Sequence, residues 1–214
     1  DKININKNNI IKKKDFFHNF FPNFINNKFI ALSGTKIKDD GLHLFESKDG
    51  IIWDIKNKIL DENNILKFFK NKNHFDTHNS INYNNLDKFY YLHTRHNNFD
   101  DKRKVQVIKT YDLKTLLDPE LINIDNNYNY EIYNLNVDKL NHHEYFIGIP
   151  NYGESKIMKN IENKDFMIKN KFIKNIIVSK DGVNFKTFIP EIKLSNINNC
   201  NQVCPVNGFT SSKD

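Results

Sequence analysis

The feature of this sequence that most constrains its fold is a short phrase that occurs three times along the chain. Each copy places a Ser or Thr two positions before an Asp and ends on a large apolar residue, at residues 47–53, 110–116 and 179–185. The three Asp residues, Asp49, Asp112 and Asp181, are 63 and 69 positions apart. Repetition at a nearly constant period predicts an architecture in which one structural unit is repeated around or along an axis.

Each phrase follows two apolar segments that have the length of β-strands. One segment directly precedes the phrase, at residues 41–46, 105–109 and 175–178, and the other lies before it, at residues 29–33, 89–93 and 145–149. Short apolar runs bounded by turn residues are typical of strands. The phrase itself is suited to a turn, because Ser and Asp side chains hydrogen-bond to nearby backbone, and Gly50 and Gly182 adopt positive φ at little cost. We call each phrase an Asp turn.

The number of segments in each unit indicates the fold class. A further segment precedes each pair and a short strand follows each turn, so that each unit has four antiparallel strands, which predicts an all-β fold, the β-propeller. We expect blades at residues 15–60, 75–120 and 131–190, with residues 191–214 beginning a further blade. Because propellers typically have four to eight blades, we expect a single, incomplete propeller domain that is a fragment of a longer chain.

Charge and composition restrict the classes of partner. The formal net charge is +6 at pH 7, but the Lys residues are scattered among 26 acidic residues. This favours a solvated surface over a nucleic-acid site, which needs a basic patch with interleaved aromatics. The sequence has no apolar run of about 18 residues, so we expect no membrane span. Cys200 and Cys204 lack the second pair of ligands that a zinc site needs, so we expect a local disulfide or two ordinary thiols, and no metal or cofactor.

Three carboxylates recur at similar places in the three units. Asp15, Asp76 and Glu131 each lie 13 or 14 positions before the apolar segment at residues 29, 89 or 145. Since the first strand of each propeller blade lines the central channel, we expect these side chains to converge at one mouth of it. Convergent carboxylates can divide the roles of acid and base, as glycosidic bond cleavage requires. The alternative is coincidence in a chain with 26 acidic residues.

Further candidates lie close to these carboxylates in the sequence. His18 and His78 occupy matching places in the first two units, each followed by Asn, and the third unit has Tyr133 followed by Asn at this place. We expect His18, His78, Asn79 and Tyr133 to contact substrate hydroxyls, and Arg95 to reach a carboxylate or a sugar. For the two histidines, the alternatives are a structural role or, less favoured, metal binding. For Tyr133 the alternative is a position in the core, and for Arg95 it is a surface salt bridge.

Together these motifs resemble a known family. Residues 75–79, 89–92, 112–113 and 179–185 are similar to the five-bladed propeller glycosidases, the β-fructosidase and arabinosidase-like group of glycoside hydrolase families 32 and 43. The resemblance covers residues 15–190 and implies a five-bladed ring. It also implies a nucleophile or base, a transition-state stabiliser and a general acid on successive inner strands, which fall by position on Asp15, Asp76 and Glu131.

Two functions remain open from the sequence. The first is a glycoside hydrolase-like protein that acts on a glycan or a small saccharide. The second is a non-catalytic propeller that binds glycans or proteins, because the residues around the carboxylates depart from the family motifs. Asp76 is flanked by Phe75 and Thr77 where the family has Arg and Pro. Glu131 is followed by Ile132 where the family has Cys. The sugar, the linkage, the oligomeric state and the cellular compartment are not indicated.

Overall fold

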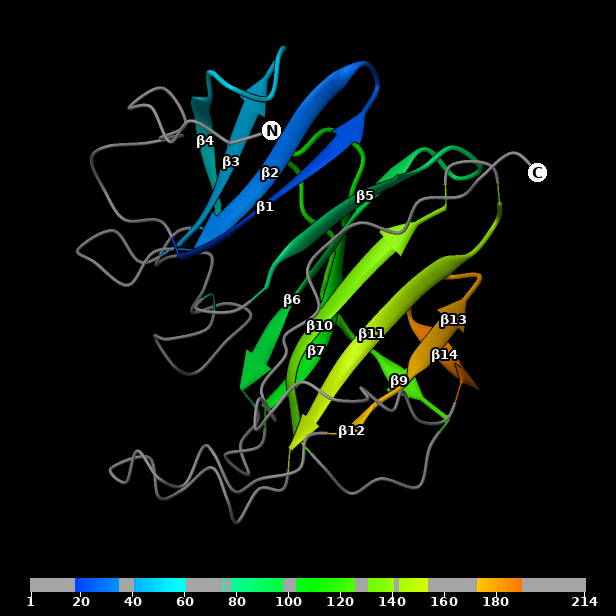
Figure 1. Ribbon diagram of the computed structural model, residues 1–214. Helices are drawn as coiled ribbons and strands as arrows, with labels where there is room; N and C mark the ends of the chain where they lie inside the picture. The colour runs from blue at the N-terminus through cyan, green and yellow to red at the C-terminus, as the bar shows by residue number, and fades with distance from the viewer. Residues whose placement is uncertain are drawn as a thin grey trace, which may run out of the picture.

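The computed structural model describes residues 18–34, 41–60, 75, 78–97, 103–125, 131–140, 143–153 and 173–189. Regular secondary structure in these ranges consists of β-strands alone. In this part of the chain no helix has the length and apolar character that crossing a membrane requires. The strands form three sheets that lie side by side (Figure 1).

Each sheet follows the chain in order, with antiparallel neighbours. The first contains β1 (His18–Ile25), β2 (Lys28–Gly34), β3 (Leu42–Ser47) and β4 (Asp54–Leu60). The second contains β5 (Ser80–Asn84), β6 (Phe89–Asn97), β7 (Arg103–Thr110) and β8 (Glu120–Leu121). The third contains β10 (Glu131–Lys139), β11 (Phe146–Gly153), β13 (Ile176–Ser179) and β14 (Asn184–Ile189).

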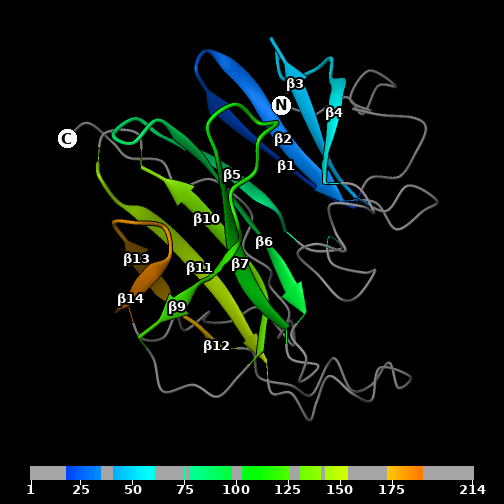
Figure 2. The same cartoon turned by 180° about the vertical axis from the view of Figure 1, so that it is seen from behind.

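Two short strands extend the third sheet. β12 (Ile173–Lys174) pairs with β11, and β9 (Asn123–Ile124), which follows the second sheet in sequence, pairs in parallel with β14. The first strands β1, β5 and β10 lie next to one another, with β5 in the middle. The predicted fold class is confirmed: the chain folds as four-stranded antiparallel blades of a β-propeller, seen from behind in Figure 2.

The Asp turns have the hydrogen bonds that their sequences predict. In the first, Ser47 Oγ accepts from the N–H of Gly50 at 2.9 Å, and Asp49 Oδ1 accepts from the next two N–H groups at 2.8 and 2.9 Å. The turns at Asp112 and Asp181 repeat this pattern. Gly50 and Gly182 have φ of 74° and 71°, whereas Leu113 adopts φ of 60° at the matching place. The second turn therefore holds a non-glycine residue in the left-handed region, where a Cβ is unfavourable.

The apolar core lies between the blades. One cluster joins the first and second blades and includes Leu32 and Leu92, and another joins the second and third blades and includes Tyr91 and Phe146. Tyr91 and Leu92 are neighbours on β6 yet belong to different clusters, because successive strand residues point to opposite faces. The second blade is thus buried on both faces. We call the face that a blade turns to the next blade in sequence its forward face.

Candidate functional site

The first strands of the three blades place their starting residues at one end of the molecule. β1, β5 and β10 run in the same direction, so that their N-terminal ends lie on the same side (Figure 1). Of the site residues expected from the sequence, His18 begins β1, His78 and Asn79 directly precede β5, and Glu131 begins β10. We call this side the N-terminal mouth.

Glu131 is the acidic candidate that the structure describes. It is the first residue of β10, lies opposite Gly153 of β11 and is 3% exposed. A charged side chain is rarely buried to this extent without a specific role or partner. Asp15 and Asp76 lie outside the described residues. Glu131 therefore lies where an inner-strand carboxylate is expected. The convergence of the three side chains stays a prediction.

Strand pairing corrects the residues from which the spacing of the carboxylates is counted. Phe29, Tyr90 and Phe146 lie opposite the first residues of the three Asp turns, and we call each of them the reference residue of its blade. The alignment on residues 29, 89 and 145 is therefore wrong by one residue in the second and third blades. In the corrected register Asp15 and Asp76 both precede their reference residue by 14 positions, and Glu131 precedes its own by 15. Each count crosses an inner hairpin of different length, and the pairing shifts both between residues 18 and 21 on β1 and between residues 132 and 134 on β10, so the counts alone do not place the three carboxylates at equivalent positions.

The residues directly before β5 pack against the first blade or bond within the second. The ring of His78 lies 4.4 Å from that of Phe21 on β1, at a tilt of 53°. Asn79 is fully buried, and its side-chain amide donates to the carbonyl of Phe75 at 3.1 Å. His18 and Tyr133 lie on β1 and β10, where only their backbone is described. Contact of these four residues with a substrate stays a prediction.

Arg95 lies inside the protein rather than at its surface. It lies opposite Val105 in the pairing of β6 with β7 and is 5% exposed. The alternative of a surface salt bridge is therefore wrong. Its neighbour Thr94 is also buried and accepts a hydrogen bond from Gln106 Nε2 at 3.1 Å. Arg95 thus belongs to a buried polar layer in the half of β6 that lies toward the N-terminal mouth.

Two asparagines that the sequence reasoning did not single out connect the inner strands. Asn23 Nδ2 donates to the carbonyl of Ile81 at 3.0 Å, and Asn82 Nδ2 donates to the carbonyl of Val137 at 2.8 Å. Asn82 Oδ1 also accepts from Asn23 Nδ2 at 3.1 Å and from the N–H of Lys139 at 2.9 Å. Asn23 and Asn82 are equivalent, since each lies opposite the residue after its blade's reference position. Asparagine is so frequent in this chain that neither position stands out from the sequence.

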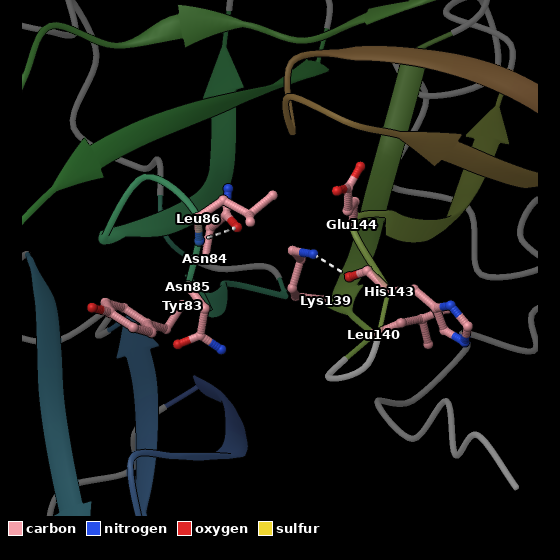
Figure 3. Close-up of a pocket in the computed structure, with 8 residues that line it drawn as sticks. All are labelled: Tyr83, Asn84, Asn85, Leu86, Lys139, Leu140, His143 and Glu144. Atoms are coloured by element: carbon pink, nitrogen blue, oxygen red, sulfur yellow. Dashed lines mark hydrogen bonds between the residues drawn. The ribbon is translucent and has the colours of Figure 1, made fainter. Parts of the chain in front are cut away.

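A small cavity lies at the opposite end of the inner strands (Figure 3). It has a volume of about 200 Å³ between the loop after β5 and the loop after β10, and it is lined by Tyr83, Asn84, Asn85, Leu86, Lys139, Leu140, His143 and Glu144. Lys139 Nζ donates to the carbonyl of His143, and partial burial lowers the pKa of Lys139. This cavity and Glu131 lie at opposite ends of β10, so they are separate sites.

Metal-binding groups are absent from the part of the chain that is described: no three His, Cys, Asp or Glu side chains there lie close enough together to hold an ion. The polar groups near the N-terminal mouth are instead a carboxylate, amides and imidazoles on neighbouring blades. Such a set can bind hydroxyl groups and transfer protons.

Known structures share this fold at low sequence identity. A family 43_1 glycoside hydrolase from Xanthomonas citri, complexed with xylotriose, matches with a TM-score of 0.57 and 7% identity over 85% of this chain and 56% of its own. A family 43 β-xylosidase/α-arabinofuranosidase from a compost microbial metagenome, also with xylotriose, has a TM-score of 0.57 and 12% identity over 82% of this chain and 58% of its own. An N-acetylgalactosamine deacetylase from F. plautii, in complex with blood group B trisaccharide, has a TM-score of 0.53 and 13% identity over 80% of this chain and 53% of its own.

These matches concern the fold. The chain spans about half the length of the structures it matches. No protein-family model and no curated protein sequence matches it. The fold resembles that of the family 43 glycoside hydrolases, and the deacetylase shows that proteins with a different named activity share it.

Proposed function

We propose that this protein is a glycoside hydrolase-like propeller that cleaves a glycosidic bond in a glycan or small saccharide, with Asp15, Asp76 and Glu131 as its functional carboxylates. The observation that carries the proposal is the place of Glu131. It is a buried carboxylic acid at the first residue of an innermost strand, on the side where the inner strands begin. Asp15 and Asp76 precede the first strands of the first two blades in the sequence, which supports a related role for them.

In this proposal each carboxylate has a separate role. Glu131 donates its proton to the glycosidic oxygen, so that the bond to the anomeric carbon breaks and the leaving sugar departs as an alcohol. Asp15 either takes a proton from the attacking water or attacks the anomeric carbon itself, and Asp76 stabilises the positive charge that develops on the sugar ring. The two routes differ in stereochemistry, because a nucleophile retains and a base inverts the anomeric configuration. An NMR measurement of the first product anomer distinguishes them.

The matched structures supply the first substrates to test. Two of them hold xylotriose and one is named as an arabinofuranosidase as well as a xylosidase. We therefore propose xylo-oligosaccharides and arabinofuranosides, each as the natural oligosaccharide and as the 4-nitrophenyl glycoside.

The test uses Glu131→Gln, with Glu46→Gln, a half-buried residue on β3, as the matched control. We expect Glu131→Gln to lower kcat on an oligosaccharide by about 10² to 10⁴, the usual contribution of a general acid. A nitrophenyl leaving group departs without protonation, so the loss on that substrate is expected to be much smaller. Equal losses on both substrates, or full activity in Glu131→Gln, would remove Glu131 from the acid role.

A second candidate function is glycan binding without cleavage, which the cavity at the far end of the inner strands favours. Its lining combines an aromatic ring, two amides, a cation and a carboxylate, which are groups suited to sugar hydroxyls and ring faces. Calorimetric titration with the same oligosaccharides separates the two functions. Saturable binding that is lost in Asn85→Ala, kept in Glu131→Gln and accompanied by no product supports this candidate and contradicts the first.

A further inference from the structure

The outer strands of the first and third blades, β4 and β14, have the same register. Each follows an Asp turn and pairs in antiparallel fashion with the strand before that turn. Ile55 lies opposite Phe45 in the first blade. Thr187 lies opposite Ile177 at the equivalent places of the third blade, and both ladders contain a register shift at the equivalent place. What binds along one of these outer strands is therefore a guide to what fits the other.

In the third blade the outer edge of β14 is occupied by the parallel strand β9. The N–H of Asn123 donates to the carbonyl of Val183 at 2.9 Å. The N–H of Asp125 donates to the carbonyl of Phe185 at 3.0 Å, and its Oδ1 accepts from the N–H of Thr187 at 2.6 Å. The edge thus takes up two backbone N–H groups and offers one N–H to a carboxylate.

The side chains of the occupying strand alternate in character. Ile122 and Ile124 pack against the core cluster that includes Val183, a residue that is 9% exposed. Asn123, between them, belongs to the opposite face of the sheet, because successive strand residues alternate. With Asp125 following, residues 122–125 read apolar, polar, apolar, acidic. This order matches the two faces of the edge that they occupy.

The first blade presents the equivalent edge with its side chains exposed. Among the strands that the structure describes, β4 pairs with β3 alone. Ile51, at the place of Val183, is 65% exposed, and Ile55 is 43% exposed. Trp53, between them in the alternation, is partly buried. These three residues form an apolar row beside an edge that no described strand covers.

A polar groove lies beside the start of the same strand. It has a volume of about 580 Å³, and its lining includes three lysines and two carboxylates, at Lys28, Lys48, Lys56, Glu46 and Asp54. Lys28 Nζ lies 3.5 Å from a carboxylate oxygen of Glu46. Lys56 Nζ lies 3.6 Å from one of Asp54. A groove with both signs of charge suits polar side chains, whereas the apolar row suits apolar ones.

We propose that the outer edge of β4 binds an extended peptide of a partner protein as a parallel strand, with side chains in the order apolar, polar, apolar, acidic. In such strand addition, backbone hydrogen bonds give affinity and alternate side chains give specificity. The two apolar side chains cover Ile51 and Trp53, and the polar one faces the groove. The acidic side chain accepts from the N–H of Ile55, as Asp125 accepts from that of Thr187.

The chain itself supplies the probe, a synthetic peptide with the sequence of residues 120–127. Trp53 is the single tryptophan and lies on the proposed edge, so its fluorescence reports occupancy. We expect a saturable change in Trp53 fluorescence when the peptide is titrated into the full chain. A peptide carrying Ile124→Asp is expected to bind about tenfold more weakly or less, because it cannot bury the apolar side chain.

Two variants of the protein test the two kinds of contact. Ile55→Pro removes the N–H offered to the acidic side chain, and proline is tolerated on an edge strand. We expect it to raise the Kd about tenfold or more, whereas Ile55→Val, the matched control, retains the N–H and the affinity. Ile51→Lys removes an apolar contact and is expected to weaken binding as well. Its control is Leu86→Lys, at a residue of the second blade that is 67% exposed.

The remaining outcomes decide between occupants. Circular dichroism identifies any variant that fails to fold, so one folded variant is enough. No fluorescence response to the peptide, or a response that the folded edge variants leave unchanged, would overturn the proposal. Trp53 fluorescence that changes with protein concentration in the absence of peptide would overturn it in favour of a second copy on this edge. Binding that the edge variants weaken and the controls retain supports it.

Discussion

We predict that His93 makes the interface between the second and third blades sensitive to pH. It is fully buried on β6, and its Nε2 lies 2.9 Å from the carbonyl oxygen of Gly182 in the third Asp turn. Because a carbonyl only accepts, Nε2 carries the hydrogen, so the ring can remain neutral in this contact. The rings of Phe146 and Phe185 lie 6.0 and 6.2 Å away. Burial lowers the pKa of His93 to about 4, the hydrogen bond to Gly182 raises it in part, and the positive charge of Lys109 lowers it further.

The sign and size of the pH effect follow from this pKa. The ordinary pKa of 6.5 applies in the unfolded chain, so between pH 6.5 and 4 the unfolded state holds a proton that the folded state lacks. The stabilisation is therefore complete above pH 6.5 and is lost as the pH falls toward 4. At about 1.4 kcal/mol per pH unit, the loss over this window is about 3 kcal/mol. That is a large share of the roughly 5–15 kcal/mol that keeps a domain folded.

The assay is urea unfolding of the full chain at several pH values between 7 and 4, followed by circular dichroism and Trp53 fluorescence. His93→Gln retains a donor for the Gly182 carbonyl but does not titrate, so we expect its unfolding free energy to fall by about 3 kcal/mol less than that of the unaltered chain over this range. His143→Gln, at an exposed residue, is expected to follow the unaltered chain. If the unfolding free energies of the unaltered chain and His93→Gln fall in parallel as the pH is lowered, the reasoning is refuted.

Two further predictions concern the contacts between blades and the Asp turns. Asn82→Ala removes the bonds between inner strands and leaves buried groups unpaired, so we expect a loss of about 2–4 kcal/mol in urea unfolding. Asn57→Ala, which loses one bond of 3.4 Å, is expected to lose under about 1 kcal/mol, and equal losses would contradict a special role for Asn82. Gly182→Ala and Gly50→Ala both place a Cβ at positive φ, but only at Gly182 does the new atom approach within 2.9 Å of the Tyr91 ring. We expect Gly182→Ala to lower the melting temperature more, and the reverse order would contradict this packing argument.

The repeating strands and turns were predictable because local chemistry determines them. The apolar segments at residues 29–33, 89–93 and 145–149 are found within or one residue from β2, β6 and β11, and the Ser/Thr and Asp side chains bond within their own turns. The register was wrong by one residue because the inner hairpins differ in length. The connecting loops have two residues between β1 and β2, four between β5 and β6 and six between β10 and β11. An alignment that assumes equal loops cannot detect this drift.

Contacts between blades were not predictable in the same way. The parallel pairing of β9 with β14 connects residues about 60 positions apart, at Asn123 and Asn184, and two hydrogen-bonded residues of β9 carry no pattern of their own. The amide contacts of Asn23 and Asn82 depend on which strand face meets the next blade, and this is known only once the register is known. For the site, the sequence placed Glu131 at the start of an inner strand correctly, whereas the burial of Arg95 depends on the stacking of blades.

The inner strands change in character from blade to blade, and this change bears on function. The forward positions of β1 are mainly apolar and are occupied by Phe21, Asn23 and Ile25. The equivalent positions of β5 carry a hydroxyl and two amides, at Ser80, Asn82 and Asn84. On β10 the first two of these positions are occupied by Asn136 and Asp138. Most of these side chains are buried. Burying polar groups costs free energy unless they are bonded, and a propeller that needed only to be stable could use apolar residues on every inner strand, as β1 largely does. Amides occur on both β5 and β10, so the feature that distinguishes β10 is its two carboxylates, Glu131 and Asp138, and Glu131 is the one that we propose as the general acid.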